Sequence, residues 1–177
     1  MNAKHLVVGA IVGGIILFLW GAVTHAVLPQ PMHYFKDEQA VVQALRANAP
    51  VNGIYFGPHG IFASVAFLPD LGDKTRHIGP NLLRQLFTDM LAALLLAAFL
   101  TCLPGTVLGR AGWAALAGIV AVALKILPYW NWYGFPPAFI GMEALDLVGK
   151  FFLGALVLGA LMKKLPPTAT WPGPEAL

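Results

Sequence analysis

The stretch PAFIGMEALDLVGKFFLGALVLGALM, residues 137–162, decides the fold of this chain. It is apolar apart from Glu143, Asp146 and Lys150, and Lys163 and Lys164 follow it. As a helix rising about 1.5 Å per residue, it is long enough to cross the hydrocarbon core of a bilayer. Its apolar residues do not alternate with polar ones as they do in barrel strands, so we expect a membrane-spanning helix.

Three further apolar stretches have a similar length, and they are residues 6–28, 81–103 and 108–127. Pro80 suits the start of the second span, and Pro128 is expected to end the third. The first span follows Lys4 and is longer than the apolar core of a signal peptide, so we interpret it as a signal anchor. Cleavage after Ala26 is the alternative. The sequence therefore predicts an all-α, four-helix transmembrane bundle.

The composition agrees with a bilayer as the solvent. Of the 177 residues, 58% are hydrophobic and 11% are charged, whereas a soluble domain carries roughly 25% charged residues. The net charge of +3 comes without a Lys/Arg-rich run, which argues against nucleic-acid binding. We expect one transmembrane domain over residues 1–165 and a flexible tail over residues 166–177. The single cysteine, Cys102, excludes an internal disulfide.

A more polar segment, residues 29–79, separates the first two spans. Residues 36–48 are predicted to form an amphipathic helix with Val41, Val42 and Leu45 on one face. Asn52-Gly53 is a turn signal. Residues 61–68 are apolar but too short to cross a bilayer, and a strand, a buried loop and an interfacial segment all remain open.

Basic residues predict the orientation of the spans. Both termini and the connection between spans two and three carry Lys4, Arg110, Lys163 and Lys164, with no acidic residue before Glu175. The segment over residues 29–79 mixes bases with acids. The positive-inside rule therefore places both termini in the cytoplasm and this segment outside. Tyr129, Trp130, Trp132 and Tyr133 are expected to form an aromatic rim at the outer surface.

Six charged residues lie in or near the outer halves of the spans. Glu143, Asp146 and Lys150 have the spacing of one helical stripe. Charges at this depth face the bundle interior and pair. We expect a buried charge cluster in which the bases neutralise the acids, with an ion path or a docking site as alternatives. Its members are Arg84, Asp89, Lys125, Glu143, Asp146 and Lys150.

No motif for a reaction is present. Ser64 is the only serine and lacks the flanking glycines of a hydrolase nucleophile. Four histidines on the outer side are candidate metal ligands, although their spacing matches no ligand motif: His25, His33, His59 and His77. No cofactor is predicted, and the aromatic rim offers a contact surface for a pigment, quinone or lipid.

Small residues recur at four-residue spacing in three spans, at Gly9 and Gly13, at Ala114 and Gly118, and at Ala155 and Gly159. Such pairs let helices approach closely. We expect them to serve packing within the chain more than dimerisation.

Three strings together resemble a family of small, uncharacterised bacterial inner-membrane proteins. They are Phe18-Leu19-Trp20-Gly21 with His25 and Leu28-Pro29, Ala47-Asn48-Ala49-Pro50 with Gly53-Ile54-Tyr55, and Trp130-Asn131-Trp132-Tyr133-Gly134-Phe135-Pro136. The resemblance covers about residues 15 to 160. It implies a multi-pass protein of the bacterial inner (plasma) membrane, and it transfers no catalytic residue because the family has no established activity.

The function that we expect is non-catalytic. Small size and the absence of a reaction motif favour an accessory or structural subunit that packs against other membrane protein subunits, in a respiratory or photosynthetic complex for example. A small transporter or channel using the charge cluster is one alternative. A membrane metalloenzyme using the outer histidines is another.

Overall fold

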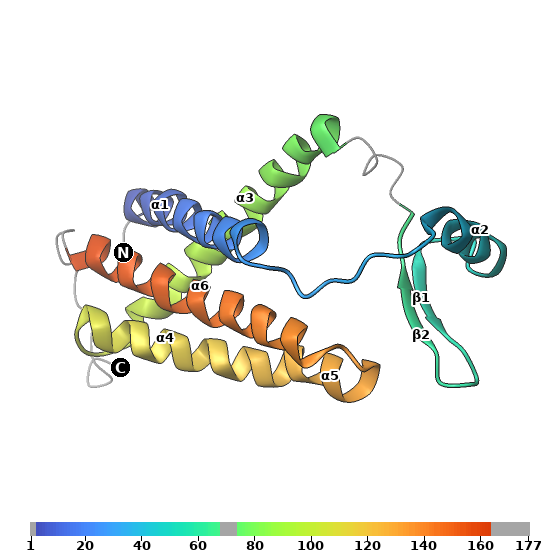
Figure 1. The fold of residues 1–177 in the computed structure, drawn as a ribbon. Helices are drawn as coiled ribbons and strands as arrows, with labels where there is room; N and C mark the ends of the chain where they lie inside the picture. The colour runs from blue at the N-terminus through green and yellow to red at the C-terminus, as the bar shows by residue number, and fades with distance from the viewer. Residues whose placement is uncertain (1–2, 68–73, 164–177) are drawn as a thin grey trace, which may run out of the picture. The chain divides into compact units, whose positions relative to one another are not determined.

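A computed structural model describes the backbone of residues 3–67 and 74–163 and the side chains of residues 6–67 and 78–162. The chain divides into two compact units, one built from residues up to Gln30 and from Leu82 onward, the other from Pro31–Asn81. The elements in chain order are α1 (Ala3–Ala22), the π-helix η1 (Val23–Val27), α2 (Glu38–Asn48), β1 (Gly53–Phe56), β2 (Phe62–Val65), α3 (Lys74–Thr101), α4 (Val107–Ala121), the π-helix η2 (Val122–Ile126), α5 (Leu127–Tyr133) and α6 (Pro137–Lys163) (Figure 1).

Among the described residues, four helical stretches are long and apolar enough to cross a membrane, as the sequence predicts: Leu6–Val27, Ile78–Thr101, Val107–Tyr133 and Pro137–Met162. Their bounds follow the predicted spans closely, except in the second and third. Pro80 lies inside α3 and not at its start. Pro80 is the seventh residue of the helix, beyond the first turn that proline prefers, so the predicted start at this residue is wrong.

The third span was predicted to end at Pro128, and this prediction is wrong. The helix runs from α4 through η2 into α5 and ends at Gly134, which adopts a left-handed conformation with φ of 68°. Proline cannot donate to the carbonyl four residues earlier and collides with it. The π-helical turn immediately before Pro128 widens the helix, and such a turn accommodates this mismatch without ending the span.

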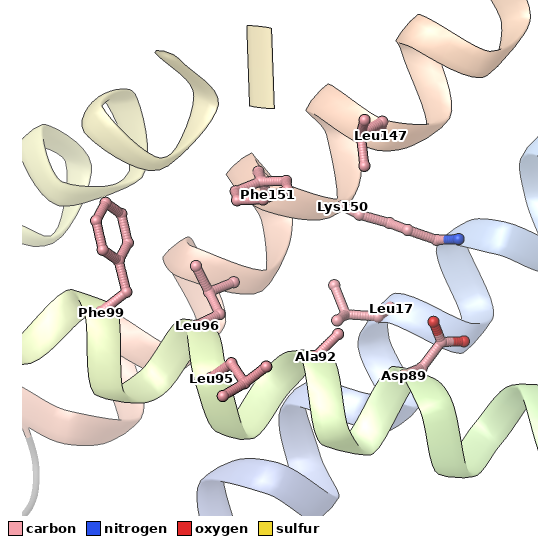
Figure 2. A pocket seen from close by; sticks show the side chains of 9 residues that line it. All are labelled: Leu17, Asp89, Ala92, Leu95, Leu96, Phe99, Leu147, Lys150 and Phe151. Atoms are coloured by element: carbon pink, nitrogen blue, oxygen red, sulfur yellow. The ribbon is translucent and has the colours of Figure 1, made fainter. Parts of the chain in front are cut away.

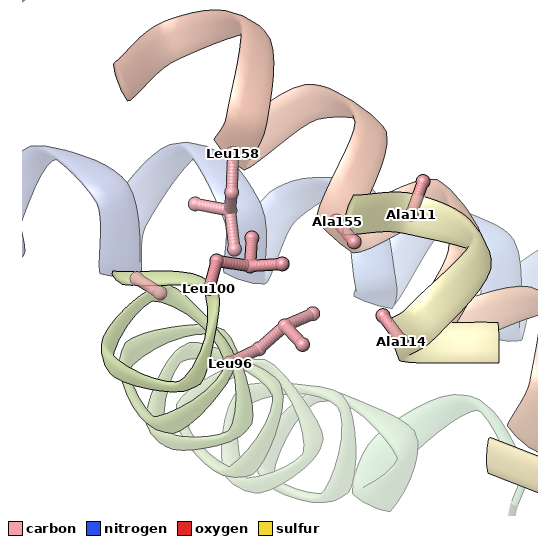
Figure 3. Close-up of a cluster of buried hydrophobic side chains, with 7 residues drawn as sticks. Leu96, Leu100, Ala111, Ala114, Ala155 and Leu158 are labelled. Carbon is pink, nitrogen blue, oxygen red and sulfur yellow. The ribbon is translucent and has the colours of Figure 1, made fainter. Parts of the chain in front are cut away.

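The first unit has its apolar core where α3, α4 and α6 meet. Figure 3 shows Leu96 and Leu100 of α3 directed toward Leu158 of α6 and toward the short side chains of α4. Ala111, Ala114 and Ala155 are fully buried. A Cβ on Gly118 would stand 3.2 Å from the Val148 backbone, so α4 and α6 approach closely.

The small residues at four-residue spacing serve packing within the chain, and this prediction is confirmed. A Cβ on Gly13 would meet Ala93 of α3 at 2.8 Å and Leu158 of α6 at 3.0 Å. A Cβ on Gly159 would meet Val107 of α4 at 3.1 Å. Both glycines therefore lie where their helix closely approaches another helix of the same chain, and the contact is tightest at Gly13.

The second unit contains α2 and a hairpin. Asp37 caps α2 by accepting a hydrogen bond from the Ala40 amide at 2.9 Å, and the predicted apolar face is half-buried. Of the three alternatives left open for residues 61–68, the described part forms a strand. β2 pairs antiparallel with β1 in the register Gly53↔Val65, and the Asn52 side chain accepts from the Phe67 amide at 2.7 Å.

The small sheet adds β structure that the all-α prediction omitted, although about 75% of the described residues are helical. The predicted flexible tail over residues 166–177 lies outside the described residues.

Candidate functional site: a buried charged cluster beside an apolar cavity

Asp146 and Lys150 of α6 form an ion pair, with Lys150 Nζ 2.9 Å from Asp146 Oδ2. The two residues are one helical turn apart, so their side chains share a face of α6. The other carboxylate oxygen of Asp146 accepts a hydrogen bond of 2.6 Å from the hydroxyl of Thr24, which is fully buried. His25 Nε2 also lies 3.6 Å from Asp146 Oδ2. The carboxylate thus has polar neighbours on both oxygens.

The π-helical turn η1 holds Thr24 and His25 against Asp146. The Leu28 amide donates to the carbonyl of Val23 at 3.0 Å, which leaves the Thr24 carbonyl without the partner that an α-helix would give it. The Gln30 side chain supplies one, donating to that carbonyl at 2.6 Å. One turn earlier, the Trp20 indole donates to the backbone carbonyl of Asp146 at 3.1 Å. The end of the first span is therefore fixed to α6 by polar contacts.

Asp89 of α3 is a second buried acid, and it has a different environment. It is only 5% exposed. Its Oδ1 accepts a hydrogen bond from the Gln85 side chain at 3.1 Å, while Oδ2 is buried with no hydrogen-bond partner. Among the described residues it forms no ion pair. An unpaired carboxylate oxygen in apolar surroundings is costly, which makes Asp89 an unusual polar group among the described residues.

An apolar cavity of about 330 Å³ lies between α1, α3 and α6, and Asp89 and Lys150 stand at one end of it (Figure 2). Leucine and phenylalanine side chains form most of its wall. The lining residues are Leu17, Asp89, Ala92, Leu95, Leu96, Phe99, Leu147, Lys150 and Phe151. The cavity is open on one side, since Leu95 and Phe99 of its wall are 63% and 39% exposed.

The site lies deeper than the sequence suggested. Asp89 stands near the midpoint of the stretch Ile78–Thr101, and Lys150 near the midpoint of Pro137–Met162. Both were predicted in the outer halves of their spans, with Lys150 the deepest of the cluster. For Asp89 the difference arises because α3 begins earlier than Pro80, whereas the bounds of the span that holds Lys150 are as predicted.

The six residues of the predicted charge cluster do not form one network. Lys125 is exposed, and its ammonium lies 5.4 Å from the centre of the Tyr129 ring. Arg84 is exposed, and Glu143 is half-buried. Among the described residues, Lys125 therefore does not pair with an acid of the predicted cluster. The structure brings together Asp146 and Lys150 of this set and adds Thr24 and His25 of the first span.

The three candidate metal ligands whose side chains the structure describes are not gathered into one site. Within the described residues, no group of three or more His, Cys, Asp or Glu is close enough to hold a metal ion. His33 and His59 are exposed in the second unit. The side chain of His77 lies outside the described residues. Only His25 reaches the charged cluster, where it contacts one carboxylate.

The predicted aromatic rim lies on α5. Trp132 is 76% exposed and Trp130 is 55% exposed. The Tyr129 ring contacts those of Tyr133 and Phe135, with centroids 6.1 and 5.5 Å apart. The structure thus presents the two tryptophans outward and packs the other rings against one another.

Sequence analysis did not single out Trp20, Thr24 and Gln30 as site residues. A signal for the first two was present, since Gly13, Leu17, Trp20 and Thr24 follow one another at intervals of three or four on one helical face. A polar residue that continues a packing stripe in an apolar span points at the bundle interior. No comparable signal marks Gln30, because its role depends on the π-helical turn.

No family model matches the chain, and no curated protein and no solved structure is significantly similar to it. The resemblance of the three strings to a family of inner-membrane proteins therefore stays a prediction.

Proposed function

We propose that this chain is a non-catalytic, multi-pass membrane protein that binds a lipid-soluble molecule within its spans. The observation that carries the proposal is the cavity between α1, α3 and α6, which ends on the buried, unpartnered oxygen of Asp89. Ligand sites are mostly apolar cavities with a few convergent polar groups, and their volumes begin at about 300 Å³. An ionisable side chain kept inside a membrane span is a functional-site candidate because its position is costly.

In this proposal the four candidate spans form a transmembrane bundle in a bacterial inner membrane, with both termini in the cytoplasm. The unopposed basic residues at the predicted cytoplasmic ends support that orientation. The aromatic residues of α5, exposed at Trp130 and Trp132, support a position at the opposite surface. The polar contacts around Asp146 fix the first span to the last, which keeps the wall of the cavity in place.

We also propose that the protein acts as an accessory subunit of a larger membrane complex, holding its ligand for that complex. The absence of a reaction motif in the sequence supports a binding role over a catalytic one. A transporter is the second candidate. The specific observation in its favour is that Asp89 and Lys150 lie near the midpoints of their stretches, beside the same cavity.

The test is to purify the full-length protein from its native membrane in a mild detergent and analyse the organic extract by mass spectrometry. We expect a lipid-soluble molecule in a fixed ratio to the protein, and proteins that co-elute. Ala92→Trp, which fills the cavity, should lose the molecule. Ala98→Trp is the matched control on the same helix, because Ala98 is exposed and does not line the cavity. Equal retention by both variants would contradict the proposed site.

The transport candidate needs a separate measurement. Reconstituted vesicles should show solute flux that depends on Asp89 if the protein is a carrier. Flux that persists unchanged in Asp89→Asn would dismiss this candidate and leave the binding role intact.

A further inference from the structure

The two buried acids near the polar end of the cavity have different partners. Asp146 has Lys150 as its ion-pair partner at 2.9 Å, whereas Asp89 has no basic partner among the described residues. The side chains of Asp89 and Lys150 lie at the same end of the cavity in Figure 2. The ammonium of Lys150 is therefore engaged by Asp146, which His25 also approaches at 3.6 Å. Asp89 Oδ2 is left as a buried hydrogen-bond acceptor without a partner at this end of the cavity.

We infer that the ligand is a lipophilic amine, with an apolar body in the cavity and an ammonium group at Asp89; this inference rests on the proposed binding function. An ammonium group supplies both the positive charge and the N–H donors that Asp89 Oδ2 lacks. A hydrogen bond between ionised groups is roughly twice as strong as one between neutral groups. A carboxylate-headed ligand would meet repulsion from Asp89 instead.

The ammonium of Lys150 does not point into the cavity, where it would repel an amine ligand. Its ammonium is turned to Asp146 and shares that carboxylate with the Thr24 hydroxyl. What Lys150 presents to the cavity is then chiefly its methylene stem, as long basic side chains do where an apolar surface is available. Lys150 is paired with Asp146, whereas Asp89 has no ion-pair partner among the described residues.

The wall of the cavity suits a flexible hydrocarbon body. Beyond Asp89, the lining runs along α3 through Leu96 to Phe99, and Phe151 of α6 faces it. No other polar side chain lines this part, so the body of the ligand needs no polar groups of its own. Two sources offer this chemistry, a free single-chain amine and a membrane lipid with a primary amine in its headgroup.

The test measures competition for a photoreactive analogue of dodecylamine that carries a diazirine in its alkyl chain. The full-length protein is placed in phosphatidylcholine nanodiscs, labelled with light, and digested for mass spectrometry. Dodecylamine, dodecanol and dodecanoate then compete for labelling of the peptides that line the cavity. The three share one chain length and differ only in the polar group.

We expect dodecylamine to compete at a concentration about tenfold or more below that of dodecanol, because one charge-assisted hydrogen bond is worth at least a factor of ten. Dodecanoate should be the weakest competitor. Asp89→Asn keeps the shape of the side chain and removes its charge. In this variant the ratio of the dodecanol concentration to the dodecylamine concentration that halves the labelling should fall close to one. Competition by dodecanol itself should not change. Comparing the two proteins in the same bilayer cancels differences in how the competitors partition.

The outcomes separate the two levels of the proposal. Equal competition by dodecanol and dodecylamine, or a preference that survives in Asp89→Asn, would overturn the amine assignment and leave an apolar binding site. Labelling that no competitor reduces, or that Ala92→Trp does not reduce, would overturn the binding function as well. If phosphatidylethanolamine in the nanodisc competes like dodecylamine, the source is a membrane lipid. If it does not compete, the source is a free amine.

Discussion

Gly149 lies where the first span meets the last, beneath the indole ring of Trp20. A Cβ at this position would come within 2.5 Å of the indole nitrogen. That nitrogen donates to the backbone carbonyl of Asp146, so the glycine lets the aromatic ring reach the charged cluster. The close contact is as much part of the site as the ionisable groups, since it sets the distance between α1 and α6.

Gly149→Ala should therefore displace the Trp20 ring, and Gly141→Ala is its matched control. Both glycines lie on α6, but a Cβ on Gly141 would have nothing within 4 Å. We expect Gly149→Ala to lower the free energy of unfolding by about 1–3 kcal/mol, the usual cost of overpacking. Gly141→Ala should have no destabilising effect. Denaturant unfolding in mixed micelles measures the difference, and equal stability of the two variants would contradict the packing described here.

Lys150 forms an ion pair with the buried carboxylate of Asp146, so its removal should lower the free energy of unfolding. Lys150→Met leaves the carboxylate with the Thr24 hydroxyl and with His25, which lies 3.6 Å away and is half exposed, but without its ion-pair partner at 2.9 Å. We expect a loss of about 3 kcal/mol or more, because the carboxylate stays buried after its closest cation is removed. The double variant with Asp146→Asn should recover much of that loss. Lys125→Met is the control, since Lys125 is exposed and contacts only a ring. A Lys150→Met protein as stable as the parent in the same micelles would refute the pairing.

Among the elements, α2 shows most simply how a helix start is fixed. Asp37 precedes the helix in an extended conformation and accepts from the Ala40 amide, while Glu38 in the first turn suits the positive end of the helix dipole. This start is in the second unit, so its effects can be followed there without touching the charged cluster.

Asp37→Ala should remove the cap and raise the exchange rate of the amides at the start of α2. A lost cap costs about 1 kcal/mol, which corresponds to exchange roughly fivefold faster. Asp37→Asn keeps an acceptor and should leave the rates nearly unchanged. Hydrogen exchange of the full-length chain, read by mass spectrometry, gives the rates. Unchanged exchange in Asp37→Ala would mean that the cap does not hold the helix.

The apolar elements were predictable because lipid imposes one simple requirement, a long apolar helix. The end of the third span was not predictable from the sequence. The steric and hydrogen-bonding penalty of Pro128 is relieved by a π-helical turn, and no sequence pattern indicates that turn. The hairpin was missed for a related reason. Its strands, Gly53–Phe56 and Phe62–Val65, are short, and short apolar runs do not distinguish a strand from a buried loop.

At the scale of the whole molecule, the pairing of Asp146 with Lys150 follows from spacing along one helix. The isolation of Asp89 does not, because it depends on which side chains the neighbouring helices bring to it. The cavity was equally hidden, as its wall combines residues from α1, α3 and α6 that no local pattern connects. Sequence therefore located the charges, and only the packed structure separates the paired acid from the unpaired one.

The central claim is that lipid is the solvent for four spans, and sided cysteine labelling tests it most directly. In a Cys102→Ala background, single cysteines replace Trp132 at the end of α5 and Pro104 between α3 and α4; both native residues are exposed. An impermeant maleimide added to intact cells should label position 132 and should label position 104 only after the membrane is opened. Labelling of both positions from the same side of the membrane would contradict the four-span account, and so would a protein that remains monodisperse in water without detergent.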